Sequence, residues 1–382
     1  MAHTTCRLCD QSLPDSPLLH FRNMPAAAQH LPDRAQLAHD QGVDLDIYQC
    51  TACGLVQTAH APVPYYREVI RAAAFSDEMK AFRRQQFADF VKQYGLHGQR
   101  LLEVGCGRGE YLALFAAAGL DAHGLEYGAE AVAAASAQGL RVTRGFVEHA
   151  QQPLPDAPFD AFAVLNFLEH WPDPRSSLRG IAHNLRDGGI GLVEVPNFDM
   201  ILRHHLFTEF ISDHICYFTR DTLTSLLQLS GFEVIRCTTV WHDYILSAVV
   251  RKRTPCDVAG FNTARARLQQ ELDAFLHRHA AQGIAIWGAG HQALATIALL
   301  ELADHVRYVV DSAPFKQDKF TPATHLPILP PEHLAHEPVG AVIVMAASYS
   351  DEVVRTIRQR WGDAYQLAIL REQGLEILPR GT

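Results

Sequence analysis

The chain has no apolar run long enough to cross a membrane, and its polar first residues, MAHTT, are unlike a secretory signal. It also has no excess of positive charge, since 42 acidic residues outnumber 33 lysines and arginines and give a net charge of −9. This balance and the absence of a basic stripe interleaved with aromatic residues argue against a nucleic-acid-binding surface. We therefore expect a cytoplasmic protein with a small-molecule substrate and no nucleic-acid or membrane partner.

Two common nucleotide-binding motifs are missing from the first glycine-rich turn, at residues 105–109. Its spacing is G-x-G-x-G, which is neither the dinucleotide pattern G-x-G-x-x-G nor a G-x-x-x-x-G-K-[ST] phosphate loop. A disulfide framework is also not indicated, because the eight cysteines are unevenly placed along 382 residues. A chain of this length is sufficient for two or three domains.

Four of the cysteines form two C-x-x-C pairs near the start of the chain. Each pair can bind one edge of a tetrahedral zinc ion, and two pairs complete a closed four-thiolate site. A closed site has no position for substrate, so the metal would stabilise a segment too small to build a core. Neither pair lies in a thioredoxin-like βαβ pattern, which disfavours a redox role. The predicted ligands are Cys6, Cys9, Cys50 and Cys53, while His20, His30 and His39 could also ligate in principle.

Residues 101–112, LLEVGCGRGEYL, read as a buried strand, a glycine turn and the start of a helix. This geometry allows a bound nucleoside to approach the backbone closely, because glycine has no side chain. A second short strand ends in Glu126, and an acid about 20 residues after the first strand can accept both ribose hydroxyls. The pattern resembles the first motif of the Rossmann-like S-adenosylmethionine (SAM) methyltransferases. The alternative is a βα turn with no ligand.

That resemblance implies a SAM site along the carboxyl ends of the strands. Glu103 would contact the methionine end of SAM, and the glycines would let the cofactor lie against the turn. Phe146 or Val147 would cover the adenine ring. The full set of expected cofactor-binding residues is Glu103, Gly105, Cys106, Gly107, Glu126, Tyr127, Phe146, Val147 and Asn166.

The order of elements, β-α-β-α-β-β, predicts an α/β fold with a doubly wound sheet. The resemblance implies that this sheet is of the class I SAM methyltransferase type. An amphipathic helix is expected over residues 76–94, with Arg83 on its outer face. We place domain boundaries to give a zinc-binding domain (1–64), a methyltransferase core (65–252) and a C-terminal Rossmann-like domain (253–382).

Candidate catalytic residues follow the fourth strand and precede a later helix. Glu169 and His170 come after the strand 159–165, at the edge where open α/β sheets bind ligands. His214 lies in the segment EFISDHICYFT, where Asp213 or Tyr217 could orient it. Methyl transfer needs a well-positioned nucleophile and, for a carbon acid or hydroxyl, a general base. The predicted catalytic residues are His214, Asp213, His170 and Tyr217.

The chain as a whole resembles the three-domain C-methyltransferases that methylate nucleotide-linked keto-deoxysugars. The shared features are the cysteine pairs, the EVGCG turn, the Glu-His after strand four, the acid-His-x-x-Tyr-Phe segment and a third α/β domain. The family's Tyr-x-Glu-His pattern implies His214 as the base at a carbon beside a keto group. Here Ile211 and Asp213 replace its tyrosine and glutamate. O- or N-methylation of another metabolite is the alternative.

After an expected long helix over residues 261–282, a second strand-and-glycine turn reads G-x-G-x-x-A, and Asp311 ends the next strand. Three interpretations remain open: docking of a substrate phosphate, a structural vestige, or NAD(P) binding. The resemblance favours docking of a nucleotide-linked or otherwise anionic substrate. The expected substrate-binding residues are Tyr65, Tyr66, Arg71, Glu169, Asn197, His291, Lys316 and His325.

Two functions of other classes also remain. An RNA methyltransferase could use the zinc-binding part as its reader, and a non-catalytic protein could use two Rossmann-like domains as a dinucleotide sensor. The acidic net charge disfavours the RNA methyltransferase.

Overall fold

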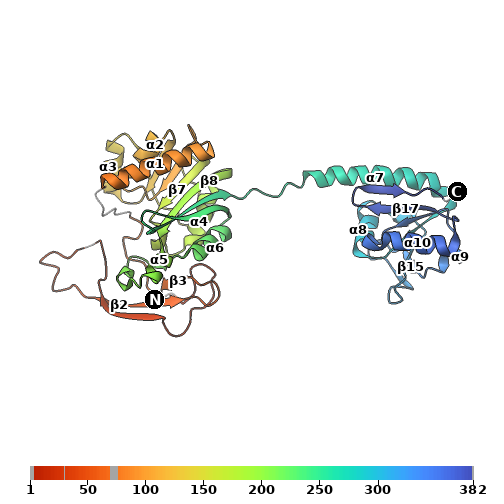
Figure 1. The fold of residues 1–382 in the computed structure, drawn as a ribbon, viewed down its shortest axis with the longest axis horizontal. Helices are drawn as coiled ribbons and strands as arrows, with labels where there is room; N and C mark the ends of the chain where they lie inside the picture. The colour runs from red at the N-terminus through yellow and green to blue at the C-terminus, as the bar shows by residue number, and fades with distance from the viewer. Residues whose placement is uncertain (1–3, 30, 69–75, 381–382) are drawn as a thin grey trace. The chain divides into compact units, whose positions relative to one another are not determined.

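The computed structural model describes residues 4–29, 31–68 and 76–380 (Figure 1). Its contacts divide the chain into two compact units, Met1–Pro255 and Cys256–Thr382. The finer division of the first unit at residue 64 stays a prediction. None of the described helices combines the length and apolar character that crossing a bilayer requires.

A seven-stranded sheet forms the centre of the first unit, with the strand order β10-β11-β8-β7-β4-β5-β6. The strands from β8 to β6 run parallel, as predicted, whereas β11 is antiparallel to both β8 and β10. We did not predict this antiparallel pairing of β11. The strands are β4 (Arg100–Val104), β5 (Asp121–Glu126), β6 (Arg141–Arg144), β7 (Phe159–Leu165), β8 (Leu185–Pro196), β10 (Phe232–Val240) and β11 (Ile245–Lys252).

Helices cover both faces of this sheet, which confirms the doubly wound α/β fold (Figure 1). Apolar side chains of α1 and α2 pack on one face, and those of α4 and α6 pack on the other. The strands β6 and β7 follow each other without a helix, as in the predicted order, whereas the helix α4 between β7 and β8 was not predicted. The helices are α1 (Asp77–Tyr94), α2 (Glu110–Ala117), α3 (Ala129–Ala137), α4 (Pro174–His183), α5 (Phe198–Arg203) and α6 (Arg220–Leu229).

A buried ion pair attaches α1 to the sheet. Arg83 of α1 and Glu194 of β8 form a salt bridge with both side chains fully buried, and Gln86 donates to the other oxygen of Glu194. The guanidinium of Arg83 also lies 4.9 Å from the ring centre of Tyr111. We had expected Arg83 on the outer face of the helix. That expectation was wrong because a carboxylate on the sheet offsets the cost of burying the charge.

Replacing Glu194 with alanine should lower the free energy of unfolding by about 3–5 kcal/mol, because Arg83 would keep a buried charge without its partner. The double variant Arg83→Met/Glu194→Leu should recover much of that loss. Urea denaturation measures both effects, with Arg84→Met, an exposed arginine of the same helix, as the control. A double variant as unstable as Glu194→Ala would contradict the assignment of the ion pair.

The N-terminal part of the first unit forms a four-stranded sheet, in the order β1-β2-β3-β9. Its last strand comes from a distant part of the chain and lies two residues after His214. β9 pairs antiparallel with β3, and the Thr58 N–H donates to the Ile215 carbonyl at 3.1 Å. The N-terminal sheet therefore holds the segment that carries the predicted base. The strands are β1 (Leu19–Met24), β2 (Val43–Gln49), β3 (Val56–Thr58) and β9 (Cys216–Tyr217).

The second unit is a separate α/β domain around a seven-stranded sheet, in the order β14-β15-β13-β12-β16-β17-β18. The predicted long helix is α7 (Ala259–His279), which packs with α8 on one face, while α9 and α10 pack on the other. The remaining elements are β12 (Ile284–Trp287), α8 (His291–Leu299), β13 (Tyr308–Val310), β14 (Lys319–Phe320), β15 (Pro327–Leu329), α9 (His333–His336), β16 (Ala341–Val344), α10 (Ser350–Trp361), β17 (Gln366–Arg371) and β18 (Gly374–Ile377).

Candidate functional site

The glycine turn after β4 is held in place by the acid that ends β5. Gly105 and Gly107 have φ angles of 75° and 57°, which disfavour residues with side chains. The carboxylate of Glu126 accepts the N–H of Gly107 at 2.9 Å and that of Gly128 at 2.8 Å. The two sequence motifs that we assigned to SAM binding are therefore in direct contact.

A cavity of about 510 Å³ lies beside this turn. Glu126 lies in its wall, and a carboxylate can accept hydrogen bonds from hydroxyl groups. Glu103 is buried at the end of β4, and the Cys106 side chain is buried beside Gly124, where an added Cβ would lie 2.5 Å from its sulfur. Cys106 can thus offer SAM only its backbone. The cavity is lined by Glu68, Gly107, Arg108, Glu110, Glu126, Gly128, Ala129, Glu130, Ala131 and Arg144.

Three aromatic rings gather near this cavity around the side chain of Arg67. Its guanidinium lies 4.9 Å from the ring centre of Tyr66, 5.4 Å from Tyr127 and 5.9 Å from Phe146. Two of these rings were predicted to contact SAM, and Tyr66 was predicted to contact substrate. Arg67 was not predicted, although it directly follows the Tyr-Tyr pair that we selected. Val147 is fully buried beside this group.

Glu169, His170 and His214 form a cluster at the carboxyl end of β7. Glu169 and His170 lie in the 3₁₀ turn η1 (Leu168–His170), and His214 precedes β9. One carboxylate oxygen and one nitrogen of each imidazole all lie within 4.8 Å of one another. The two imidazole rings are 4.8 Å apart and nearly perpendicular. The Ile215 N–H donates to the Glu169 carbonyl at 3.0 Å and joins the two segments.

The surroundings of this cluster favour the uncharged form of each group. Burial, together with the neighbouring His170, lowers the pKa of His214 well below 6.5. Burial also lowers the pKa of His170, and it raises the pKa of Glu169 to about 8. Near neutral pH, His214 therefore has a free lone pair that can accept a proton.

Asp213 does not contact His214 in the way we expected. Its carboxylate accepts the Tyr65 hydroxyl at 2.8 Å and the Ala28 N–H at 2.8 Å, and its carbonyl accepts Nδ1–H of His170 at 2.8 Å. Among the described residues, the structure gives no hydrogen bond between this carboxylate and His214. Asp213 thus fixes the tautomer of His170 and connects the cluster to the N-terminal segment.

Two further predicted residues have structural partners. Tyr217 is buried, and its hydroxyl bonds to the backbone of Ile211, donating to the carbonyl at 3.2 Å. Asn197 caps α5 and donates to the Asp243 carbonyl at 2.7 Å, and its contact with substrate stays a prediction.

Asn166 leaves the end of β7 with a φ angle of 49°. Its buried side-chain oxygen has no hydrogen-bond partner among the described residues, which leaves it available to a ligand. The predicted substrate contact Arg71 lies outside the described residues.

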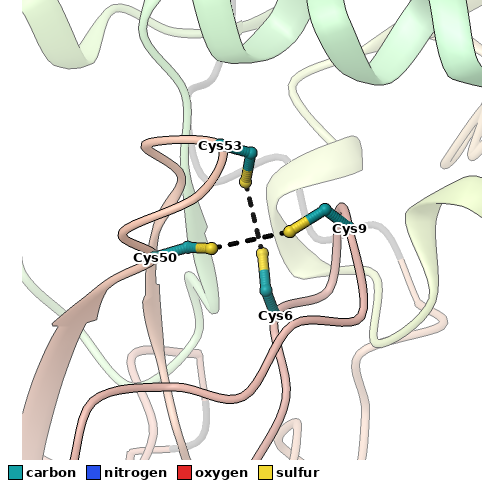
Figure 2. A group of neighbouring side chains, drawn as sticks. All are labelled: Cys6, Cys9, Cys50 and Cys53. Carbon is teal, nitrogen blue, oxygen red and sulfur yellow. Dashed lines mark hydrogen bonds between the residues drawn. The ribbon is translucent and has the colours of Figure 1, made fainter.

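The four N-terminal cysteines converge on one point (Figure 2). The Sγ atoms of Cys6 and Cys53 are 3.4 Å apart, and those of Cys9 and Cys50 are 3.5 Å apart. Tetrahedral Zn–S bonds of about 2.3 Å place sulfur atoms about 3.8 Å apart, so the cluster can accept zinc with little movement. Burial raises the pKa of the Cys6 thiol to about 11, and a bound cation would reverse this effect.

The C-terminal glycine turn has a packing explanation. A Cβ at Gly288, whose φ is 120°, would lie 2.6 Å from the Met345 carbonyl oxygen. Asp311 accepts the Ala289 N–H at 2.8 Å and the ammonium group of Lys316 at 2.8 Å. Burial opposes ionisation of Asp311, but Lys316 and backbone N–H groups hold its pKa below the usual range. Of the other predicted contacts, His291 begins α8, and both His291 and His325 are exposed.

Comparisons with known families match both units. A family model described as a methyltransferase domain matches residues 79–236, and one described as a C-methyltransferase C-terminal domain matches residues 252–369.

Relatives of this chain are methyltransferases by name. C-methyltransferase NovU of Streptomyces niveus is 24% identical over 391 residues, which cover 91% of each chain. A probable SAM-dependent methyltransferase of Mycolicibacterium smegmatis is 30% identical over 167 residues, covering 44% of this chain and 65% of its own. Among solved structures, magnesium protoporphyrin IX methyltransferase of Synechocystis, with bound SAH, has a TM-score of 0.38 and 14% identity, covering 48% of this chain and 90% of its own.

Proposed function

Because the chain belongs to the SAM-dependent C-methyltransferases, we propose that it methylates a carbon atom beside a keto group of a nucleotide-linked deoxysugar. The observation that supports this reaction best is the cluster of Glu169, His170 and His214. A half-buried, uncharged imidazole at the carboxyl edge of the sheet is suited to removing a proton from carbon. O- or N-methylation of a readily ionised group would not require such a base.

The cofactor site that we propose follows the contacts of the glycine turn. Glu126 would accept the ribose hydroxyls within the 510 Å³ cavity, and Gly107 would permit close approach of the backbone. The faces of Tyr127 and Phe146, which now contact Arg67, offer planar apolar surfaces suited to an adenine ring. When bound, SAM supplies a sulfonium methyl group that a carbon nucleophile can attack.

We assign the base to His214 and a positioning role to Asp213. His214 would take the proton from the carbon next to the carbonyl group, and His170 would shape the pocket with its tautomer fixed by the Asp213 carbonyl. Tyr65 would hold Asp213 in place through its 2.8 Å hydrogen bond. The cysteine cluster would bind a structural Zn²⁺, since four thiolates leave no open coordination position.

Docking of the nucleotide part of the substrate is proposed for the C-terminal unit, at the turn between β12 and α8. Support comes from the match of this unit to a C-methyltransferase C-terminal domain and from its free helix N-terminus. Lys316 would have to leave Asp311 to contact a phosphate directly. His291 is exposed at the first position of α8 and needs no such change.

The proposed function is tested by incubating the protein with SAM carrying a ¹³C-labelled methyl group and dTDP-4-keto-6-deoxyglucose as the probe. We expect a product with a new carbon–carbon bond, identified by ¹³C NMR coupling between the methyl group and a ring carbon. Glu126→Ala, which removes the proposed ribose contact, is the matched control and should lower SAM affinity. A methyl group attached to oxygen or nitrogen, or no product from a panel of keto sugars, would contradict the proposal.

A further inference from the structure

Glu169 is a buried carboxyl group to which the mechanism above gives no role. Only 2% of the residue is exposed, and its Oε2 atom has no hydrogen-bond partner among the described residues. Leaving a buried polar atom unpaired is unfavourable. The atom lies in the same cluster as His170 and His214, where substrate would react. A ligand that supplies the missing hydrogen bond would relieve this cost.

Apart from its own backbone N–H, the groups around Glu169 do not stabilise a negative charge. Its Oε1 atom lies 3.9 Å from Nε2 of His170, which is too far for a hydrogen bond, and the neighbouring His214 is uncharged. The other titratable groups that sense its charge are Cys216 of β9 and Tyr244, which comes just before β11. Both are groups whose pKa is raised mainly by burial, so neither provides a positive charge.

The nearby arginine has other hydrogen-bond partners. Arg7, which lies near Cys216, donates instead to three backbone carbonyl groups. The described residues therefore give Glu169 no lysine or arginine partner, and burial raises its pKa to about 8. Near neutral pH the side chain carries a proton, so it is a hydrogen-bond donor as well as an acceptor.

We propose that Glu169 is a catalytic residue that donates a hydrogen bond to the carbonyl oxygen of the substrate as negative charge develops on that oxygen. This inference rests on the proposed function, because only a carbon acceptor beside a carbonyl group produces such an oxyanion. A neutral acid in a dry pocket suits this task, since it is already oriented and does not repel the developing charge.

The step is balanced without an added oxidant or reductant. His214 accepts the proton, the electron pair of the C–H bond forms a carbon–carbon double bond, and the carbonyl π pair moves to oxygen, where Glu169 donates its hydrogen bond. As the carbonyl re-forms, the carbon bonds to the methyl group, and the electron pair of the broken carbon–sulfur bond stays on sulfur. His214 then releases its proton to solvent.

Two variants separate hydrogen-bond donation from negative charge. Glu169→Gln keeps a neutral donor of similar shape and should retain most of the activity, whereas Glu169→Leu should lower kcat by about 10²–10³. In the unmodified protein, kcat should fall as the pH rises through about 8, because Glu169 then loses its proton. This alkaline fall should be absent from Glu169→Gln. If Glu169 had only a structural role, the substitution by glutamine would not remove the fall.

Proton exchange in D₂O, with S-adenosylhomocysteine and dTDP-4-keto-6-deoxyglucose, distinguishes the two possible failures. Absence of exchange at the carbon beside the carbonyl in the unmodified protein would refute the proposed function. Exchange in the unmodified protein that stays as fast in Glu169→Leu would refute only the role of Glu169. SAM calorimetry checks that each variant is folded, and if Glu169→Leu fails this check, the pH profile of Glu169→Gln decides.

A Glu169→Gln protein as inactive as Glu169→Leu would also overturn the proposal. Loss of activity on chelation, restored by Mn²⁺, would then assign Glu169, His170 and His214 to metal binding instead.

Discussion

Replacing His214 with alanine should lower kcat by about 10²–10⁴ and leave the affinity for SAM nearly unchanged. The reason is spatial separation of roles. His214 precedes β9 and contacts His170, whereas the carboxylate that we assign to the ribose, Glu126, ends β5 and braces the glycine turn. Removing the imidazole thus removes the proton acceptor without altering the turn. Steady-state kinetics and SAM calorimetry measure the two quantities.

The pH dependence provides an independent check on this base. Burial and the neighbouring His170 hold the pKa of His214 well below 6.5, so protonation should reduce kcat only at a pH clearly below that value. His183→Ala, which removes an exposed histidine from α4, is the matched control and should retain full activity. A His214→Ala protein with normal turnover, or an acid-side loss of activity, on lowering the pH, that is already centred above pH 6.5, would remove His214 from the mechanism.

Removing the proposed zinc ion from the cysteine cluster should abolish most of the activity by displacing the same histidine. Cys50 directly follows β2 and precedes β3, and β3 pairs with β9 two residues after His214. If the cysteine cluster opens, the pairing of β3 with β9 is no longer stabilised from that side. A displacement of about 1 Å at a reacting group can cost about 10²-fold in rate.

A second connection runs from the first C-x-x-C pair to the loop after η1. Arg7 lies between two of the cysteines and donates to the Pro172 carbonyl at 3.2 Å, and Arg175 donates to the Leu8 carbonyl at 3.0 Å. The cysteine cluster thus contacts the chain on both sides of the Glu169–His214 cluster. We expect metal loss to lower kcat more than SAM affinity, because Gly107 of the glycine turn is held by Glu126 of the central sheet.

The measurement combines elemental analysis, turnover, SAM calorimetry and hydrogen exchange over residues 55–58 and 215–217, before and after chelation. Cys50→Ser should reproduce the effect of chelation. Cys256→Ser, which changes an exposed cysteine outside the cluster, should bind metal and turn over normally. Full activity and unchanged exchange in the metal-free protein would show that the cluster does not position His214.

The contacts of Asp213 and Arg83 show why the partners of these side chains could not be predicted from the sequence. The hydrogen bond between Tyr65 and Asp213 joins residues 148 positions apart, and the ion pair between Arg83 and Glu194 joins residues 111 positions apart. Periodicity within a helix placed Arg83 outside because its buried partner lies on another element. For Asp213, adjacency to His214 suggested a direct contact, but the backbone turns its carboxylate toward the N-terminal segment.

The sequence by itself determined the features that depend on short-range patterns. The cysteine spacing predicted the cluster of four sulfur atoms, and the strand-turn-helix pattern around Gly105 predicted the α/β sheet and the contact region of Glu126. These features can be predicted because C-x-x-C pairs and glycine turns are formed by residues that are neighbours in the sequence. Only the tertiary structure decided that β9 completes the N-terminal sheet and that Glu169 is buried with no lysine or arginine partner in the described part of the chain. Strand pairing and the pKa of a buried acid depend on groups that the chain brings together from distant positions, and no local pattern records them.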